Sequence, residues 1–195
     1  MKVMTYISLG KPLTDAGFAV VCINHRSSAD AKFPAQINDV KAAIRFVRAH
    51  AEEYHLDTSF VGITGFSSGG HLSSLAGVTN GMKERTVGST TVDIEGKVGN
   101  CIDASSDVDA VADWFGPVDM AHMNGCEKVN DGKSPEAALI GGVPEELPDM
   151  VSLFDEGRDK FGTADEQSFI NKRFLDCQNI SIDYGIMEKS PDTYT

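Results

Sequence analysis

The stretch from residue 60 to residue 71 constrains this sequence more than any other. It reads Phe60-Val61-Gly62-Ile63-Thr64-Gly65-Phe66-Ser67-Ser68-Gly69-Gly70-His71. An apolar run with strand character leads into Gly65-Phe66-Ser67-Ser68-Gly69, which matches G-x-S-x-G, and a helical pattern follows. A serine in this context sits on a sharp turn between a strand and a helix, with its hydroxyl above the sheet edge.

The glycine frame selects Ser67 as the candidate nucleophile. Centring the motif on Ser68 would put Phe66 where the first glycine belongs. We expect glycine at both Gly65 and Gly69 because the strand and the helix pass too close to admit a Cβ atom. The alternative is that Ser67 is an ordinary turn serine.

Three apolar runs predict strands, at residues 18–24, 60–64 and 108–116. The first, from Phe18 to Asn24, is a continuous β-branched run of the kind found in buried parallel strands. A helix is predicted to follow it from Pro34 to about residue 55. Strand, helix and strand in this order form a right-handed crossover, which predicts an α/β fold with a mainly parallel sheet and helices on both faces.

The helix that begins at Pro34 has two distinct faces at helical spacing. Its apolar face consists of Ile37, Val40, Ala43, Ile44, Val47 and Ala51. The opposite face carries Lys41, Arg45, Arg48 and Glu52.

The remaining elements are shorter. A helix is expected to end at Gly17, and residues 79–106 are expected to form a surface excursion with a hairpin near Thr91 to Ile94. Another helix is predicted from Ser134 to Ile140, with Ser134 as N-cap, Pro135 at its first position and Gly141-Gly142 as its stop. We divide the chain into a core of residues 1–150 and a weakly structured segment of residues 151–195, with one amphipathic helix near Phe169 to Leu175.

Composition limits the partners. The 195 residues, 41% of them apolar, suit one globular domain, and the net charge of -12 argues against nucleic acid and anionic membranes as partners. No apolar run approaches the ~20 residues of a membrane helix. The absence of a signal peptide favours the cytoplasm, and the four cysteines (Cys22, Cys101, Cys126 and Cys177) lack metal-site spacing, so we expect free thiols and no metal or cofactor.

Several motifs in order resemble α/β-hydrolase esterases, nearest to the acetyl-esterase/lipase-like and feruloyl-esterase-like branch. The resemblance runs from about Leu13 to Met150. Its motifs are Phe33-Pro34-Ala35-Gln36 with Asp39, Ala42-Ala43-Ile44-Arg45-Phe46, Gly65 through His71, Trp114-Phe115-Gly116-Pro117 with Asp119, and Ser134-Pro135-Glu136 through Gly142. The resemblance implies hydrolysis of a small-molecule ester through an acyl-enzyme, with Ser67 as nucleophile and the backbone N–H of Ser68 as an oxyanion donor.

The resemblance also implies an upstream oxyanion loop, and an acid and then a histidine after the serine. Nothing before Phe18 supplies that loop. His122 is the candidate base by chain order, although it comes only one strand after Ser67, whereas His71 is expected to pack within its helix. A chain truncated at both ends is the simplest explanation.

Three functions remain open on these residues. The first is a serine carboxylesterase, the second is a catalytically inactive member of the fold, and the third is a prolyl-peptidase-like hydrolase that shares the serine turn. Strands at the edges of an incomplete sheet would also promote self-association.

Overall fold

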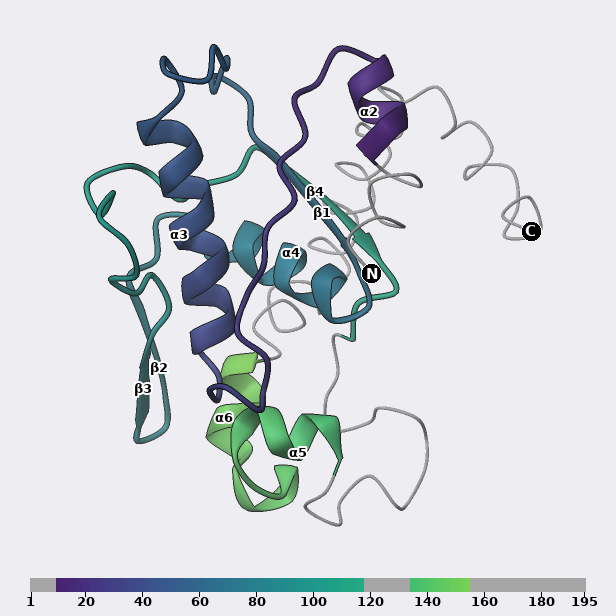
Figure 1. Cartoon of the computed structure of the whole chain (residues 1–195). Helices are drawn as coiled ribbons and strands as arrows, with labels where there is room; N and C mark the ends of the chain where they lie inside the picture. Colours follow the sequence, from purple (N-terminus) through teal and green to yellow (C-terminus); the bar gives the residue numbers. More distant parts are fainter. Residues whose placement is uncertain (1–9, 118–133, 155–195) are drawn as a thin grey trace, which may run out of the picture.

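A computed structural model describes residues 10–117 and 134–154 (Figure 1). The elements, in chain order, are α2 (Lys11–Asp15), α3 (Ala35–Ala49), β1 (Gly62–Phe66), α4 (Ser68–Val78), β2 (Glu84–Val87), β3 (Thr90–Asp93), β4 (Ala110–Trp114), α5 (Pro135–Ile140), a 3-10 helix (Pro144–Glu146) and α6 (Pro148–Phe154). The second predicted strand is shifted by two residues, and the third is shorter by two residues at each end, a difference usual for element ends.

The strands β1 and β4 form a parallel pair, in which Gly62 lies opposite Ala110 and Phe66 lies opposite Trp114. The helix α4 follows β1 directly and packs on both strands. The strands β2 and β3 form a separate antiparallel hairpin within residues 79–106, with Glu84 opposite Asp93. A parallel pair covered by the helix that connects its strands confirms the predicted α/β class.

The apolar faces of α3 and α4 form the centre of the core. The buried residues at this contact are Ile37, Val40 and Ile44 of α3 and Leu72, Leu75 and Ala76 of α4. The apolar face predicted for α3 is therefore confirmed along its first three turns. Because burial of one large aliphatic side chain contributes about 1.5–3 kcal/mol, this contact is a main source of stability. The helix ends at Ala49, about six residues earlier than predicted.

Two residues on the polar face of α3 are buried, since Lys41 and Arg45 are 0% and 1% exposed. Residues 79–106 fold over this face and bring Glu95 between the two cations. The Lys41 ammonium lies 3.3 Å from the Glu95 carboxylate and donates to the Thr79 carbonyl at 2.9 Å. The Arg45 guanidinium bonds the Glu95 carboxylate and donates to the Val98 carbonyl at 3.0 Å.

Burial lowers the pKa of Lys41, since the charged ammonium loses its hydration. Burial alone would raise the pKa of Glu95, but hydrogen bonds from Ser106 and Arg45 and the charge of Lys41 hold it below its ordinary value. The carboxylate of Glu95 is thus the counter-charge for two buried cations.

The segment from Phe18 to Asn24 is not a strand, and this prediction was wrong. It forms no ladder with β1, which pairs with β4, so the predicted crossover through α3 is not formed. A strand needs a neighbouring strand to accept its backbone N–H groups, and in the described residues this segment pairs with no strand, although one edge of β1 stays unpaired. Val21 and Ile23 are exposed as a result. Immediately after the segment, Arg26 binds the Asp39 carboxylate of α3 through its guanidinium at 2.7 Å and its backbone N–H at 2.8 Å.

The predicted helix ends are confirmed at two places. Gly17 adopts a φ of 94° just after α2, and the Ser134 hydroxyl accepts the Ala137 N–H at 3.0 Å at the start of α5. The helix α6 runs across residue 150, and its Leu153 is fully buried. The predicted helix near Phe169 lies outside the described residues.

Two further findings concern the cysteines and the length of the helices. Cys22 and Cys101 are free thiols. Among residues 10–117 and 134–154, no helix combines the length and apolar character needed to cross a membrane.

The network around Glu95 predicts a large effect of Glu95→Gln. The amide keeps the size of the side chain but leaves two buried cations without a counter-charge. Because Glu95 is partly exposed, we expect a loss of about 2–3 kcal/mol in the free energy of unfolding, measured by urea denaturation. The matched control Glu84→Gln, at an exposed position of β2, should change it by less than about 0.5 kcal/mol. Equal effects in both variants would contradict the role given to Glu95.

Candidate active site

Ser67 alone connects β1 to α4. Its φ of 53° and ψ of -120° are far from the values of either element. A non-glycine residue with positive φ is uncommon, and such a conformation costs about 1–3 kcal/mol. The backbone N–H of Ser67 donates to the Trp114 carbonyl at 2.8 Å, and its own carbonyl accepts the His71 N–H at 3.0 Å. The strained residue is therefore held by β4 on one side and by α4 on the other, and its side chain is exposed.

Gly65 explains why the turn is so tight. A Cβ atom at Gly65 would lie 2.5 Å from the backbone C and O atoms of Gly69. Strand and helix therefore meet backbone to backbone, as predicted. The same expectation at Gly69 was wrong, because a Cβ atom there would meet no atom within 4 Å. The contact is one-sided: the Cβ direction of Gly65 points at the helix, whereas that of Gly69 points into open space.

Ser68 is the first residue of α4. The N–H groups of a helix's first turn have no acceptor within the helix, and they lie at the positive end of its dipole. Such N–H groups can stabilise an oxyanion, which is the role predicted for Ser68. Its side chain is exposed, like that of Ser67.

The turn that follows β4 is held against α4 at three points, which the sequence did not reveal. The Asp113 carboxylate accepts the Ser74 hydroxyl at 2.7 Å and the Gly116 N–H at 2.7 Å. A Cβ atom at Gly116 would clash with the backbone nitrogen of His71, so this glycine permits the close contact. The His71 ring bonds the Pro117 carbonyl at 2.8 Å through Nδ1. Because a carbonyl only accepts, Nδ1 carries the proton.

The histidine rings of the described ranges contact groups other than the Ser67 hydroxyl. Burial lowers the pKa of His71 to about 4, partly offset by its bond to Pro117, so the ring is neutral at neutral pH. His50 stacks on Phe46, with ring centroids 4.1 Å apart, while His25 and His55 are exposed. Within the described ranges, no hydrogen bond links Ser67 Oγ to an imidazole or a carboxylate. His122 lies outside these ranges, and no group of three metal-ligating side chains occurs within them.

The one-sided glycine contact predicts opposite effects of two alanine substitutions. Gly65→Ala should destabilise the fold by at least about 1–3 kcal/mol, because backbone atoms of α4 must move. Gly69→Ala should be neutral or stabilising by up to about 1 kcal/mol, because alanine is the better helix former and has free space. Thermal unfolding of both variants checks this, and similar losses in the two would contradict it.

The buried neutral His71 predicts a pH dependence of stability. Its folded pKa of about 4 lies below the ordinary 6.5, so its contribution is fully present above pH 6.5 and is lost as the pH falls toward 4. Carboxylates with lowered pKa values, such as Glu95, lose their contribution only below about pH 4.5. Between pH 6.5 and 4.5 we therefore expect the free energy of unfolding to fall by up to about 1.4 kcal/mol per pH unit. In His71→Gln this slope should flatten, and an unchanged slope would refute the assignment.

Comparison with known proteins places the chain among esterases. It is 49% identical over 67 residues to the probable carboxylic ester hydrolase LipM of Mycobacterium tuberculosis, a match that covers 34% of this chain and 16% of that protein. Over a stretch of the same length it is 39% identical to esterase LipC of the same organism. The matched stretch thus covers about a sixth of the length of these relatives.

Solved structures give longer matches. A bifunctional GH43-CE protein of Bacteroides eggerthii is 64% identical, with a TM-score of 0.76 over 80% of this chain and 22% of that one. A truncated form of a carbohydrate esterase from gut microbiota is also 64% identical, with a TM-score of 0.72 over 75% of this chain and 52% of that one. An acetyl ester-xyloside bifunctional hydrolase from Caldicellulosiruptor lactoaceticus, 19% identical with a TM-score of 0.54, supports the fold alone.

The BD-FAE family model matches residues 1–155. This match, together with the esterase relatives, confirms the predicted resemblance to α/β-hydrolase esterases. The chain belongs to the BD-FAE family of esterases and has an α/β-hydrolase-type fold.

Proposed function

We propose that this chain is the part of a carboxylic ester hydrolase that carries its serine nucleophile, Ser67. The observation that supports this most is the conformation of Ser67, which is strained, exposed and placed where β1 and β4 both end. Strain of this kind concentrates at active sites, because packing alone does not reward it. The site therefore fits acyl transfer better than a structural turn.

The reaction would proceed through an acyl-enzyme. Ser67 Oγ attacks the ester carbonyl, the alcohol leaves, and water then releases the acid. The N–H of Ser68 donates to the oxygen that becomes negative in the tetrahedral intermediate. No metal or cofactor takes part in these steps. His122 is our candidate for the base that accepts the Ser67 proton, because it follows Ser67 in chain order, and a His122→Ala variant with undiminished turnover would exclude it.

The substrate class follows from the names of the relatives. Two solved structures that are 64% identical to this chain have titles that name a carbohydrate esterase or a GH43-CE protein. We therefore assign the proposed activity to esters of carbohydrates. A peptidase of the prolyl-peptidase type is the competing reading, and an assay with a proline-containing peptide amide distinguishes the two.

A fluorophosphonate probe tests the nucleophile directly. The folded chain should be labelled at Ser67, and Ser67→Ala should lose both labelling and turnover of a p-nitrophenyl ester, the latter by about 10⁴-fold or more. The control Ser68→Ala should retain both, since the role proposed for Ser68 uses its backbone N–H. A folded wild-type chain that resists the probe would favour the inactive alternative.

Self-association is a separate part of the proposal. In the described residues β1 pairs on one side only. Phe66 on that strand is exposed, and so are Val21 and Ile23 in residues 18–24. Unpaired strand edges and exposed apolar side chains promote pairing with another chain. We expect sedimentation velocity to detect dimers or larger species, whose share rises with concentration. A single monomeric species over a hundredfold concentration range would contradict this.

A further inference from the structure

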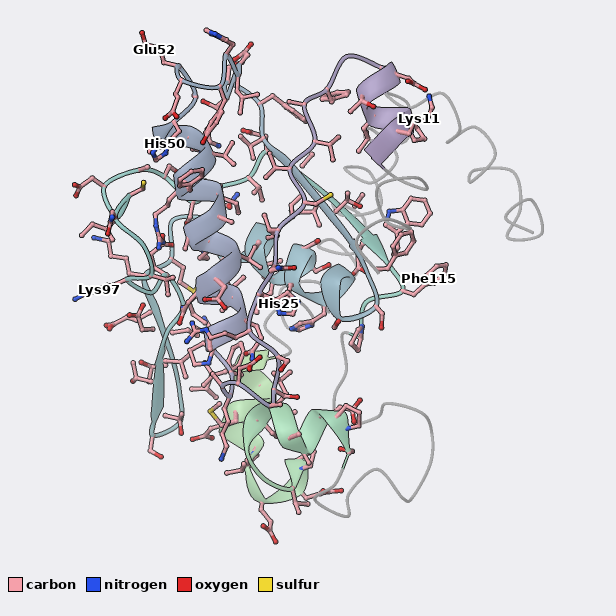
Figure 2. All side chains as sticks on the ribbon, in the orientation of Figure 1. Lys11, His25, His50, Glu52, Lys97 and Phe115 are labelled. Carbon is pink, nitrogen blue, oxygen red and sulfur yellow. The ribbon has the colours of Figure 1, made fainter. Side chains whose placement is uncertain are left out.

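Phe115 combines two features that folding alone disfavours. Its φ is 61°, a conformation that is an outlier for a bulky side chain. Its side chain is 83% exposed, more than any other large hydrophobic residue in the described part of the chain. Figure 2 shows the ring projecting outward beyond the ends of β1 and β4. Neither the backbone nor the ring therefore gains from packing.

The strained conformation is imposed by contacts on both sides of Phe115. On one side the Asp113 carboxylate accepts the Gly116 N–H and the Ser74 hydroxyl. On the other side the His71 ring bonds the Pro117 carbonyl. These bonds fix residues 113–117 against α4, so the direction of the Phe115 side chain is set in advance of any ligand. Preorganisation of this kind is typical of binding surfaces.

The turn also lies beside Ser67. Phe66 and Trp114 are register partners in the parallel pair, so the next residues, Ser67 and Phe115, leave adjacent strands at the same edge. The bond from the Ser67 N–H to the Trp114 carbonyl at 2.8 Å holds them there. Neighbouring strands are about 4.8 Å apart, so a group bonded to an ester at Ser67 is within reach of the Phe115 ring.

Trp114 is less suited to such a contact. Its indole Nε1 donates to the Thr64 hydroxyl at 3.1 Å, and its ring lies against Phe66 with centroids 5.7 Å apart. Both contacts turn it back over the strands. Phe115 is thus the aromatic ring of this turn that is offered to solvent.

We propose that Phe115 is a substrate-contact residue whose ring stacks on the sugar ring of a carbohydrate ester held at Ser67. This assignment rests on the proposed function. A sugar ring presents C–H groups on its face and hydroxyl groups around its rim. An exposed aromatic ring can cover the C–H face through dispersion and desolvation while the hydroxyls remain in water. A binding partner that stays partly hydrated matches the open position of this turn.

Replacement by glycine separates a contact role from a structural one. Phe115→Gly removes the ring and relieves the strain, because glycine adopts positive φ freely. The melting temperature should stay the same or rise by about 2–6 °C. In the Ser67→Ala background, which prevents turnover, the Kd for an acetylated methyl xyloside, titrated by NMR, should rise about tenfold on removal of the ring. Phe115→Tyr should restore binding.

A matched control uses another exposed aromatic ring. Phe46→Ala removes a ring of α3 that stacks on His50. Figure 2 shows His50 on the opposite side of the molecule from Phe115. It should leave the Kd for the sugar ester unchanged. Three results would each overturn the proposal. The first is equal affinity with and without the Phe115 ring, and the second is no binding in the Ser67→Ala background. The third is a drop in melting temperature without a change in Kd. An equal loss of affinity for ethyl butyrate would assign the ring to the acyl chain instead and would also overturn it.

The fluorophosphonate probe tests the proposed function independently of sugar binding. The wild-type chain should be labelled at Ser67 whether or not it binds the sugar ester, because the probe carries no sugar. A chain that resists labelling but binds the sugar ester through Phe115 would refute the nucleophile and keep the contact. A chain that is labelled but binds the ester equally well without the ring would do the reverse.

Discussion

The backbone contact between Gly65 and Gly69 is the constraint on which the arrangement of the site depends. Strand and helix meet without side chains between them, so one residue must reverse the chain direction. That residue is Ser67, and its positive φ follows from the lack of room for a longer turn. The same tightness places the side chain of Ser67 in solvent at the sheet edge. The exposure of Ser67 is thus a consequence of local packing.

The turn after β4 repeats this logic on the neighbouring strand. Ser67 and Phe115 are two of the three described non-glycine residues with positive φ, the third being His55. Both lie one residue past the end of a strand, and the parallel register brings them together. The carboxylate of Asp113 and the neutral ring of His71 hold the second turn against the helix that begins after the first. One helix, α4, therefore fixes both turns.

Sequence patterns predicted the features whose causes are local. The helical spacing of α4, the capping of α5 by Ser134 and the place of Ser67 all depend on residues within one or two turns of each other. Features that depend on distant partners were missed. The burial of Lys41 and Arg45 depends on the counter-charge of Glu95, which lies some fifty residues away. The segment from Phe18 to Asn24 has the composition of a strand, but composition supplies no neighbour to pair with.

Buried charge and backbone strain both cost free energy in this molecule, but their compensation differs. The cations of Lys41 and Arg45 are matched by Glu95 and by backbone carbonyls of the folded chain. The strain at Ser67 and Phe115 is not offset by packing, because both side chains are exposed. Strained conformations of this kind concentrate at active sites and ligand contacts. Since the two residues share one edge of one strand pair, their strain supports the proposal that a single ligand contacts both.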